Sequence, residues 1–257
     1  MGGLLFKLKI LLNAIRILRN WHAFPLVYFG LIKKEHVNFF TKSGMKMKIR
    51  TNSTDLDTFC LIWLLKDYGR FNFVIKPDDV IIDIGAHIGT FSLYASQFCT
   101  QGKIFCYEPS NENFELLKEN IKQNKIKNIF PENLAVSKSN DKVTFYINPD
   151  KTANSMYDKT SESISVQSTT LQQIFDLNKL ENCNYLKLDC EGAEYDIIES
   201  LPEEYFKKIE KMYIEYHFSD SKPLLLENMI KKLESASFKI INQPMEQGMG
   251  SIFAIKK

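Results

Sequence analysis

The sequence lacks the features that mark disulfide-stapled, secreted or membrane-spanning proteins. Its 257 residues contain no run of about 18 uncharged apolar residues, so no spanning helix is expected. The five cysteines are odd in number and form no C-x-x-C pair, which predicts free thiols in a reducing compartment. Lys7 and Lys9 interrupt the first apolar stretch, no small-residue cleavage site follows it, and Phe6 stands where N-myristoylation needs Ser or Thr. These absences predict a cytoplasmic protein.

Acidic residues are absent from the first 34 positions, which carry six basic side chains. The remainder holds 27 of the 33 Lys and Arg residues and all 31 Asp and Glu residues, so its net charge is −4. Nucleic-acid-binding proteins usually present a broad basic surface. A mildly acidic body therefore argues against nucleic acid as the main substrate.

Residues 1–35 are predicted to form a basic, amphipathic helical extension. A helical wheel separates a polar face from an apolar face. The polar face holds Lys9, Asn13, Arg16, Arg19 and Asn20, and the apolar face holds Leu4, Leu8, Leu11, Ile15 and Leu18. Two interpretations stay open. The helix packs on the body or on a partner chain, or it makes peripheral contact with an anionic membrane surface. The oligomeric state is also left open.

From residue 80 onward, buried strands alternate with amphipathic helices. Continuous apolar strands such as VIIDIG and KIFCYEP are typical of a parallel sheet with both faces covered. The alternation predicts a doubly wound, Rossmann-like α/β domain over 80–257, preceded by a strand and helix subdomain over 36–79. Residues 128–136 are expected to form its third strand. Residues 138–167 read as an insertion, a hairpin-like flap with a loop between two alternating strands.

The turn after the first strand of this domain reads Asp83-Ile84-Gly85-Ala86-His87-Ile88-Gly89. Gly85 permits a tight turn, and Gly89 lets the next helix approach the sheet. The G-x-x-x-G spacing is neither the G-x-G-x-x-G of a dinucleotide site nor a P-loop. A ligand with a methionine-like end fits better, its ammonium group meeting backbone carbonyls and Asp83. The alternative is an ordinary strand-to-helix turn.

Glu108 closes the second strand, about 20 residues after the glycine turn, where an acidic side chain accepts hydrogen bonds from both hydroxyls of a ribose. The alternative is a surface glutamate before Pro109. Asn133 lies near the end of the third strand, where it is predicted to bond the edge of an adenine base.

The fourth strand ends in LKLDCEGAEYDII, in which Lys187, Asp189 and Glu191 are spaced by two and point to one face. Glu215 and His217, at the end of the fifth strand, share a face and are expected to stand beside them. His217 is the candidate base that titrates near neutral pH unaided. The alternative is structural, with Lys187 neutralising the neighbouring carboxylates.

Five segments share the pattern of a known family: DIGAHIGTFSLYAS, YEPSNENFELLKENIKQN, NLAVS, LKLDCEGAEYDIIESL and IEYH. Together they resemble the FkbM family of class I methyltransferases, from about Asp55 to His217. The resemblance implies a mostly parallel seven-stranded sheet, S-adenosyl-L-methionine as cofactor and methyl transfer to oxygen, commonly on a sugar or other metabolite. It also implies site residues. By this resemblance, the residues that contact the methionine end of the cofactor are Asp83, Gly85, Ala86 and Gly89, with His87 on the same turn. Glu108 binds the ribose. The residues on the side of the methyl acceptor are Lys187, Asp189, Glu191 and His217.

The sequence therefore predicts an O-methyltransferase for a hydroxyl of a sugar, glycan or other small metabolite. We expect His217 to act as base, oriented by Glu215 or Asp189. Three alternatives stay open: a divalent metal held by Asp189 and Glu191, a catalytically silent binding module, and a nicotinamide-dependent oxidoreductase, which the glycine spacing disfavours. The sequence has no Asn/Asp-Pro-Pro-Tyr motif, which disfavours methylation of nucleobase amino groups.

Overall fold

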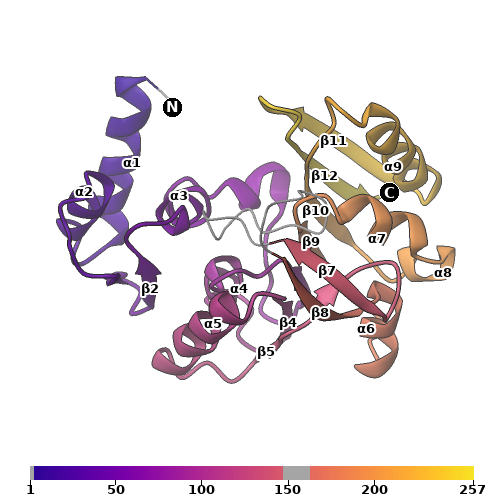
Figure 1. Ribbon diagram of the computed structural model, residues 1–257, viewed down its shortest axis with the longest axis horizontal. Coiled ribbons are helices and arrows are strands. Elements are labelled where there is room, and N and C mark those ends of the chain that lie inside the picture. Colours follow the sequence, from indigo (N-terminus) through magenta and orange to yellow (C-terminus); the bar gives the residue numbers. More distant parts are fainter. Residues whose placement is uncertain (1–2, 147–162) are drawn as a thin grey trace.

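The computed structural model describes residues 3–146 and 163–257, in which a seven-stranded sheet lies between two layers of helices (Figure 1). The strand order is β11-β12-β10-β9-β3-β4-β5. Within it, β12 is antiparallel to both of its neighbours, and the other neighbouring pairs are parallel. The strands are β3 (Val80–Ile84), β4 (Lys103–Tyr107), β5 (Ile129–Glu132), β9 (Tyr185–Asp189), β10 (Lys211–Tyr216), β11 (Phe238–Pro244) and β12 (Gly250–Lys256). The predicted Rossmann-like, mostly parallel seven-stranded fold is confirmed.

The two faces of the sheet are covered by different helices because successive side chains of a strand point to opposite faces. Ile81 packs in one buried cluster with α4 and α5, whereas Ile82 and Ile84 pack in a second cluster with α6 to α9. Figure 1 shows these two groups of helices on opposite sides of the sheet. The helices are α4 (Thr90–Ser96), α5 (Asn111–Gln123), α6 (Leu171–Leu177), α7 (Glu194–Ser200), α8 (Glu203–Phe206) and α9 (Pro223–Ser235).

Side-chain caps begin two of these helices. Ser110 accepts a hydrogen bond from the backbone N–H of Asn113 at the start of α5, and Thr170 does the same for Gln173 at the start of α6. Pro223 occupies the first turn of α9, where its missing N–H costs nothing. These caps fix where the helices begin relative to the strand ends.

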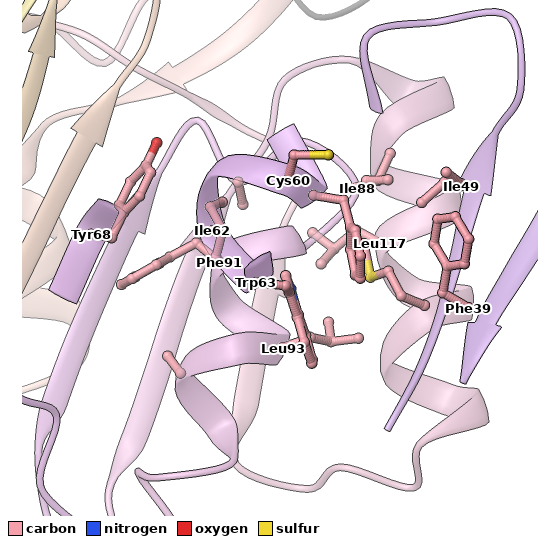
Figure 2. Close-up of a cluster of buried hydrophobic side chains, with 14 of the residues drawn as sticks. Phe39, Ile49, Cys60, Ile62, Trp63, Tyr68, Ile88, Phe91, Leu93 and Leu117 are labelled. Atoms are coloured by element: carbon pink, nitrogen blue, oxygen red, sulfur yellow. The ribbon is translucent and has the colours of Figure 1, made fainter. Parts of the chain in front are cut away.

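Residues 3–72 form a smaller layer against α4 and α5. Its elements are α1 (Leu4–Ile17), α2 (Ala23–Tyr28), β1 (His36–Phe40), β2 (Lys46–Arg50), α3 (Asp55–Phe59), the π-helical turn η1 (Cys60–Leu64) and the 3₁₀ segment η2 (Asp67–Asn72). β1 and β2 pair antiparallel. Figure 2 shows Phe39 and Trp63 from this layer in one buried cluster with Phe91 and Leu117. Trp63 Nε1 also donates to the backbone oxygen of Thr90, at 3.0 Å.

The insertion forms part of a second, three-stranded sheet ordered β6-β8-β7. The strands are β6 (Ala135–Val136), β7 (Lys142–Tyr146) and β8 (Ser163–Thr169). The expected antiparallel pairing of β7 with β8 is present, and the loop predicted between them lies largely in 147–162, outside the described residues. The single strand predicted over 128–136 is wrong. It ends at Glu132, and Ala135 and Val136 pair with β8 instead.

The described residues contain no helix with enough length and apolar character to cross a membrane. All five cysteines are free, as predicted, and four of them are buried. The division into 1–35, 36–79 and 80–257 stays a prediction.

Candidate functional site

A cavity of ≈ 360 Å³ opens beyond the carboxyl ends of β3, β4, β9 and β10. This is the edge where open parallel sheets bind ligands, and the volume is in the range of small-molecule sites. Eight of the predicted site residues line it: Gly85, Ala86, His87, Glu108, Lys187, Asp189, Glu191 and Glu215. Four others, Asp83, Gly89, Asn133 and His217, do not line it.

The glycine turn is held against the end of β9. Gly85 has φ 75°, and a Cβ added there would overlap the backbone oxygen of Asp189. The backbone N–H groups of Gly85 and Ala86 donate to the oxygen of Tyr107 on β4. Lys187 Nζ donates to the oxygen of Gly85 at 2.7 Å. A residue with a side chain would therefore displace the turn from two neighbouring strands.

Gly89 positions α4 and does not touch the cavity. Its φ of 86° places it just before the helix, and an added Cβ would overlap the Leu117 side chain of α5. This agrees with the prediction that Gly89 lets the helix approach, and it does not support a place at the methionine end.

Asp83 lies behind the turn and is fully buried. Its Oδ2 accepts from the hydroxyl of Ser92 at 2.7 Å. Lys187 Nζ lies 3.1 Å from Oδ1 as an ion pair, at an angle outside that of a hydrogen bond. Asp83 and Lys187 stand opposite each other in the register of β3 and β9. The predicted direct contact of Asp83 with a ligand ammonium is therefore not supported.

The ammonium of Lys187 stays charged inside the protein. Burial lowers its pKa, but the carboxylates of Asp83 and Asp189 outweigh burial and raise it above the ordinary value of lysine. Asp189 Oδ2 lies 3.6 Å from Nζ. Lys187 therefore interacts more closely with Asp83 and the glycine turn than with the carboxylate of Asp189 in the cavity.

Glu108 directly follows β4 and is 4% exposed. One carboxylate oxygen accepts from the N–H of His87 at 2.8 Å, and the other accepts from the N–H of Ser110 at 2.9 Å and from the amide of Asn113 at 3.4 Å. Burial raises the pKa of Glu108. A carboxylate has about four acceptor positions, so one remains for a ligand hydroxyl.

Asn133 does not line the cavity, so the structure lends no support to its predicted contact with an adenine base. Its amide donates to the backbone oxygens of Glu108 and Pro109, at 2.8 and 3.2 Å. The cavity wall there is formed by Leu134, Ala135 and Val136, which offer an apolar surface for a flat ring. Asn133 holds the ends of β4 and β5 together.

Two carboxyl groups face each other at the ends of β9 and β10. Asp189 and Glu215 are opposite in register. Burial and the Asp189 carboxylate raise the pKa of Glu215 to about 8. The hydroxyls of Tyr213 and Tyr68 donate to Glu215 and Asp189, at 3.2 and 3.3 Å. A cavity-lining carboxyl with this pKa exchanges its proton near neutral pH.

His217 lies behind this pair and is 4% exposed. Its Nδ1 is 3.3 Å from Glu194 and its Nε2 is 3.4 Å from Glu191. Burial lowers its pKa, but the hydrogen bond to Glu194 and the charges of Glu191 and Glu194 outweigh burial and raise it to about 10. The side chain is therefore an imidazolium at neutral pH. The structure does not support the prediction that His217 is a neutral base.

Ligand atoms of Asp189, Glu215 and His217 lie within 4.8 Å of one another, as in sites that hold a metal ion. This set differs from the predicted pair of Asp189 and Glu191. A metal there would have to displace the proton of His217, which the surrounding carboxylates stabilise.

Sequence reasoning missed two buried braces of the site. Arg50 and Asp55 form an ion pair, with Nη2 and Oδ1 2.8 Å apart, and Nε2 of His87 lies 3.2 Å from the same oxygen. Burial raises the pKa of Asp55, but hydrogen bonds from His87 and Arg50 outweigh it and hold the pKa well below the usual range.

The second brace is Glu194, which is fully buried. Its carboxylate accepts from the backbone N–H groups of Gly192 and His217, both at 2.8 Å. It thereby ties the loop after β9 to the end of β10. In that loop Glu191 adopts φ 52°, which is uncommon for a residue with a side chain.

The cavity fits S-adenosyl-L-methionine on two observations. The Glu108 carboxylate lines it and keeps an acceptor position for a ribose hydroxyl. Thr90, 1% exposed, also lines it, and among the described residues its hydroxyl has no hydrogen-bond partner. A buried hydroxyl without a partner costs about 1–3 kcal/mol, so a polar ligand atom would relieve it.

A sequence model described as the methyltransferase FkbM domain matches residues 83–240. Methyltransferase 1 of Beauveria bassiana is 26% identical over 162 residues, which cover 54% of this chain and 65% of that protein. Hexuronic acid methyltransferase AglP of Haloferax volcanii is 24% identical over 147 residues, covering 54% of this chain and 60% of that protein. The chain thus spans less than two thirds of the length of these relatives.

A solved structure shares the fold. The methyltransferase FkbM of Methylobacillus flagellatus superposes with a TM-score of 0.50 at 13% identity, covering 77% of this chain and 53% of that one. The family match extends from the glycine turn through the carboxylate pair to β11. The chain therefore belongs to the FkbM family of class I methyltransferases, with S-adenosyl-L-methionine as its cofactor.

Proposed function

We propose that the protein transfers a methyl group from S-adenosyl-L-methionine to a hydroxyl oxygen of a sugar, a glycan or another small metabolite. The observation that carries this proposal is a single cavity lined both by the glycine turn with Glu108 and by the Asp189–Glu215 pair. The glycine turn and Glu108 fit the cofactor. The Asp189–Glu215 pair lines the same cavity, and the pKa of its Glu215 carboxyl is near neutral. The relative named hexuronic acid methyltransferase supports a sugar as the acceptor class.

The residues of the cavity have distinct roles in this proposal. When bound, the cofactor supplies an electrophilic methyl group on a positively charged sulfur. A sugar hydroxyl is a weak acid, so a nearby base assists its attack. Glu215, in its carboxylate form, takes the hydroxyl proton. Asp189 accepts a hydrogen bond from the same or a neighbouring hydroxyl and so orients the acceptor.

His217 supports this pair from behind. As an imidazolium it lies 4.0 Å from Glu215 and 3.4 Å from Glu191, and it lowers the cost of placing their charges together. It acts as a positioning residue because it does not line the cavity. Glu215 therefore replaces His217 as the proposed base.

The test is transfer of isotope-labelled methyl from the cofactor to a panel of hexuronic acids, neutral hexoses and glycans, with products identified by mass. We expect transfer to a hydroxyl of at least one sugar. Glu215→Gln should lower the turnover number by about 10²–10⁴ while cofactor affinity stays nearly unchanged. Glu210→Gln is the matched control, because Glu210 precedes β10 at the opposite end and pairs with Lys76.

Two results would contradict the proposal. Cofactor binding with no transfer to any acceptor would instead support a silent binding module. Equal turnover of Glu215→Gln and the protein with Glu215 would remove the base assignment and leave the methyl transfer standing.

A further inference from the structure

Exposed apolar side chains gather in residues 4–31. Of the 20 large apolar side chains that are exposed among the described residues, ten belong to α1, α2 and the segments beside them. They are Leu4, Leu5, Phe6, Leu8, Leu12, Trp21, Leu26, Tyr28, Phe29 and Leu31. Scattered exposed apolar residues are ordinary, but a concentration of this kind marks an interaction surface.

Helix α1 has two apolar faces, and the body covers one of them. Ala14 is fully buried, Ile10 and Ile17 pack against the same core, and the Asn13 amide donates to the oxygen of Leu64 at 2.9 Å. Leu4, Leu8 and Leu12 are four residues apart and form a separate stripe that stays exposed. The apolar face predicted from the sequence combined residues of the buried face and the exposed stripe, since it included Leu18, which belongs to the core.

Aromatic side chains in and beside α2 continue the exposed stripe. The ammonium of Lys7 on α1 lies 5.8 Å from the centre of the Tyr28 ring, so the two helices present their exposed side chains to the same region. Phe29 is 68% exposed and Trp21 is 41% exposed. Aromatic rings with a polar edge favour the boundary between lipid and water.

The charge of this region has one sign. Lys7, Lys9, Arg16, Arg19, Lys33 and Lys34 are all exposed, and no acidic residue occurs before Glu35. Figure 1 shows α1 and α2 at one end of the molecule, away from β11 and α9. We name the exposed side chains of residues 4–34 the N-terminal basic–apolar surface.

We propose that the N-terminal basic–apolar surface binds the anionic face of a phospholipid bilayer. Apolar side chains enter the boundary of the acyl region while Lys and Arg meet lipid phosphates, a combination typical of interfacial helices. A second copy is a poorer partner, because a two-fold contact would bring the same positive charges together. A nucleic acid would satisfy the charges and leave the apolar stripe in water.

The test is flotation of the full chain with vesicles of phosphatidylglycerol and phosphatidylcholine, compared with vesicles of phosphatidylcholine alone. We expect binding to the anionic vesicles, weakened by salt. The double variant Lys33→Glu/Lys34→Glu should lower the partition coefficient by at least about tenfold. Leu4→Glu/Leu8→Glu should lower it as strongly.

The matched control is Leu177→Glu/Leu224→Glu, two leucines that are 71% and 68% exposed elsewhere on the molecule. It should bind vesicles as the unchanged chain does. Substitution is preferable to deletion of the first 20 residues, since deletion would remove the buried Ala14 and Leu18. Thermal unfolding of each variant confirms that the fold is retained.

Two outcomes overturn the proposal. The first is equal partitioning of the Leu4→Glu/Leu8→Glu variant and its control. The second is light scattering that shows a dimer of the unchanged chain and a monomer of that variant, which assigns the surface to a contact between copies. Neither outcome bears on the methyl transfer, which is measured separately on soluble acceptors.

Discussion

Replacement of Lys187 by methionine removes a buried ammonium that four oxygens surround. These belong to Asp83, Asp189, Gly85 and Ile84, at 3.1, 3.6, 2.7 and 3.5 Å. Methionine fills similar space, so the main change is the loss of charge. Asp83 then stays fully buried with only the hydroxyl of Ser92 as a donor. Removing one partner of a buried pair costs about 3–5 kcal/mol, a large part of the stability of a typical domain.

A double-mutant cycle separates the charge pair from packing. Asp83→Asn should cost less than Lys187→Met, because Lys187 keeps Asp189 and two carbonyl oxygens. The double variant removes both charges of the buried Asp83–Lys187 pair, so it should cost less than the sum of the single variants by about 1–3 kcal/mol. Urea unfolding followed by tryptophan fluorescence measures each free energy, since Trp63 lies in the core beside α4.

The control for this cycle is Lys48→Met on the surface. Lys48 pairs with Glu119 at 2.9 Å, and the Glu119 side chain is 52% exposed, so the loss should stay below about 1 kcal/mol. The reasoning fails if Lys187→Met costs no more than this control. It also fails if the effects of Lys187→Met and Asp83→Asn are additive.

Two further predictions concern the cofactor half of the cavity. Glu108→Ala should weaken binding of S-adenosyl-L-methionine by about 1.5–3 kcal/mol in calorimetry. The control Glu132→Ala, at the exposed end of the neighbouring strand, should leave the affinity unchanged. Equal cofactor affinities of these two variants would remove the assignment of Glu108 to the ribose. Gly85→Ala should reduce both cofactor affinity and melting temperature by more than Gly44→Ala, because both glycines have positive φ but only at Gly85 does an added Cβ meet other atoms. Equal melting temperatures would show that the overlap with Asp189 is relieved at no cost.

The fold was predictable because its signal is local and repeated. Strands buried on both faces need continuous apolar residues, and the helices between them need one apolar face. Right-handed crossovers then leave few possible arrangements of the strands in the sheet. Gly85 and Glu108 were recognisable on the same basis, because each stands directly after a strand.

The spacing of residues in the sequence did not predict how deeply each side chain of the site is buried. Residues two apart on a strand share a face, but spacing does not say which of them reaches the cavity. Asp83 and His217 lie behind the lining, and Asn133 turns toward the backbone of Glu108. The pairing of Asp83 with Lys187 required the strand order, because it joins residues 104 positions apart that meet only when β9 lies beside β3.

Charges near Glu215 decide when it becomes a base. Its pKa of about 8 reflects burial and the facing carboxylate of Asp189, so the protonated form predominates at pH 7. The ionised form is favoured as pH rises, and turnover should therefore increase with pH and level off above the pKa. A positively charged ligand in the same cavity favours the carboxylate, so at saturating cofactor the apparent pKa of the turnover number should lie below 8. The pH profile of methyl transfer measures this value, and a profile that falls with rising pH would show that a protonated group is needed instead.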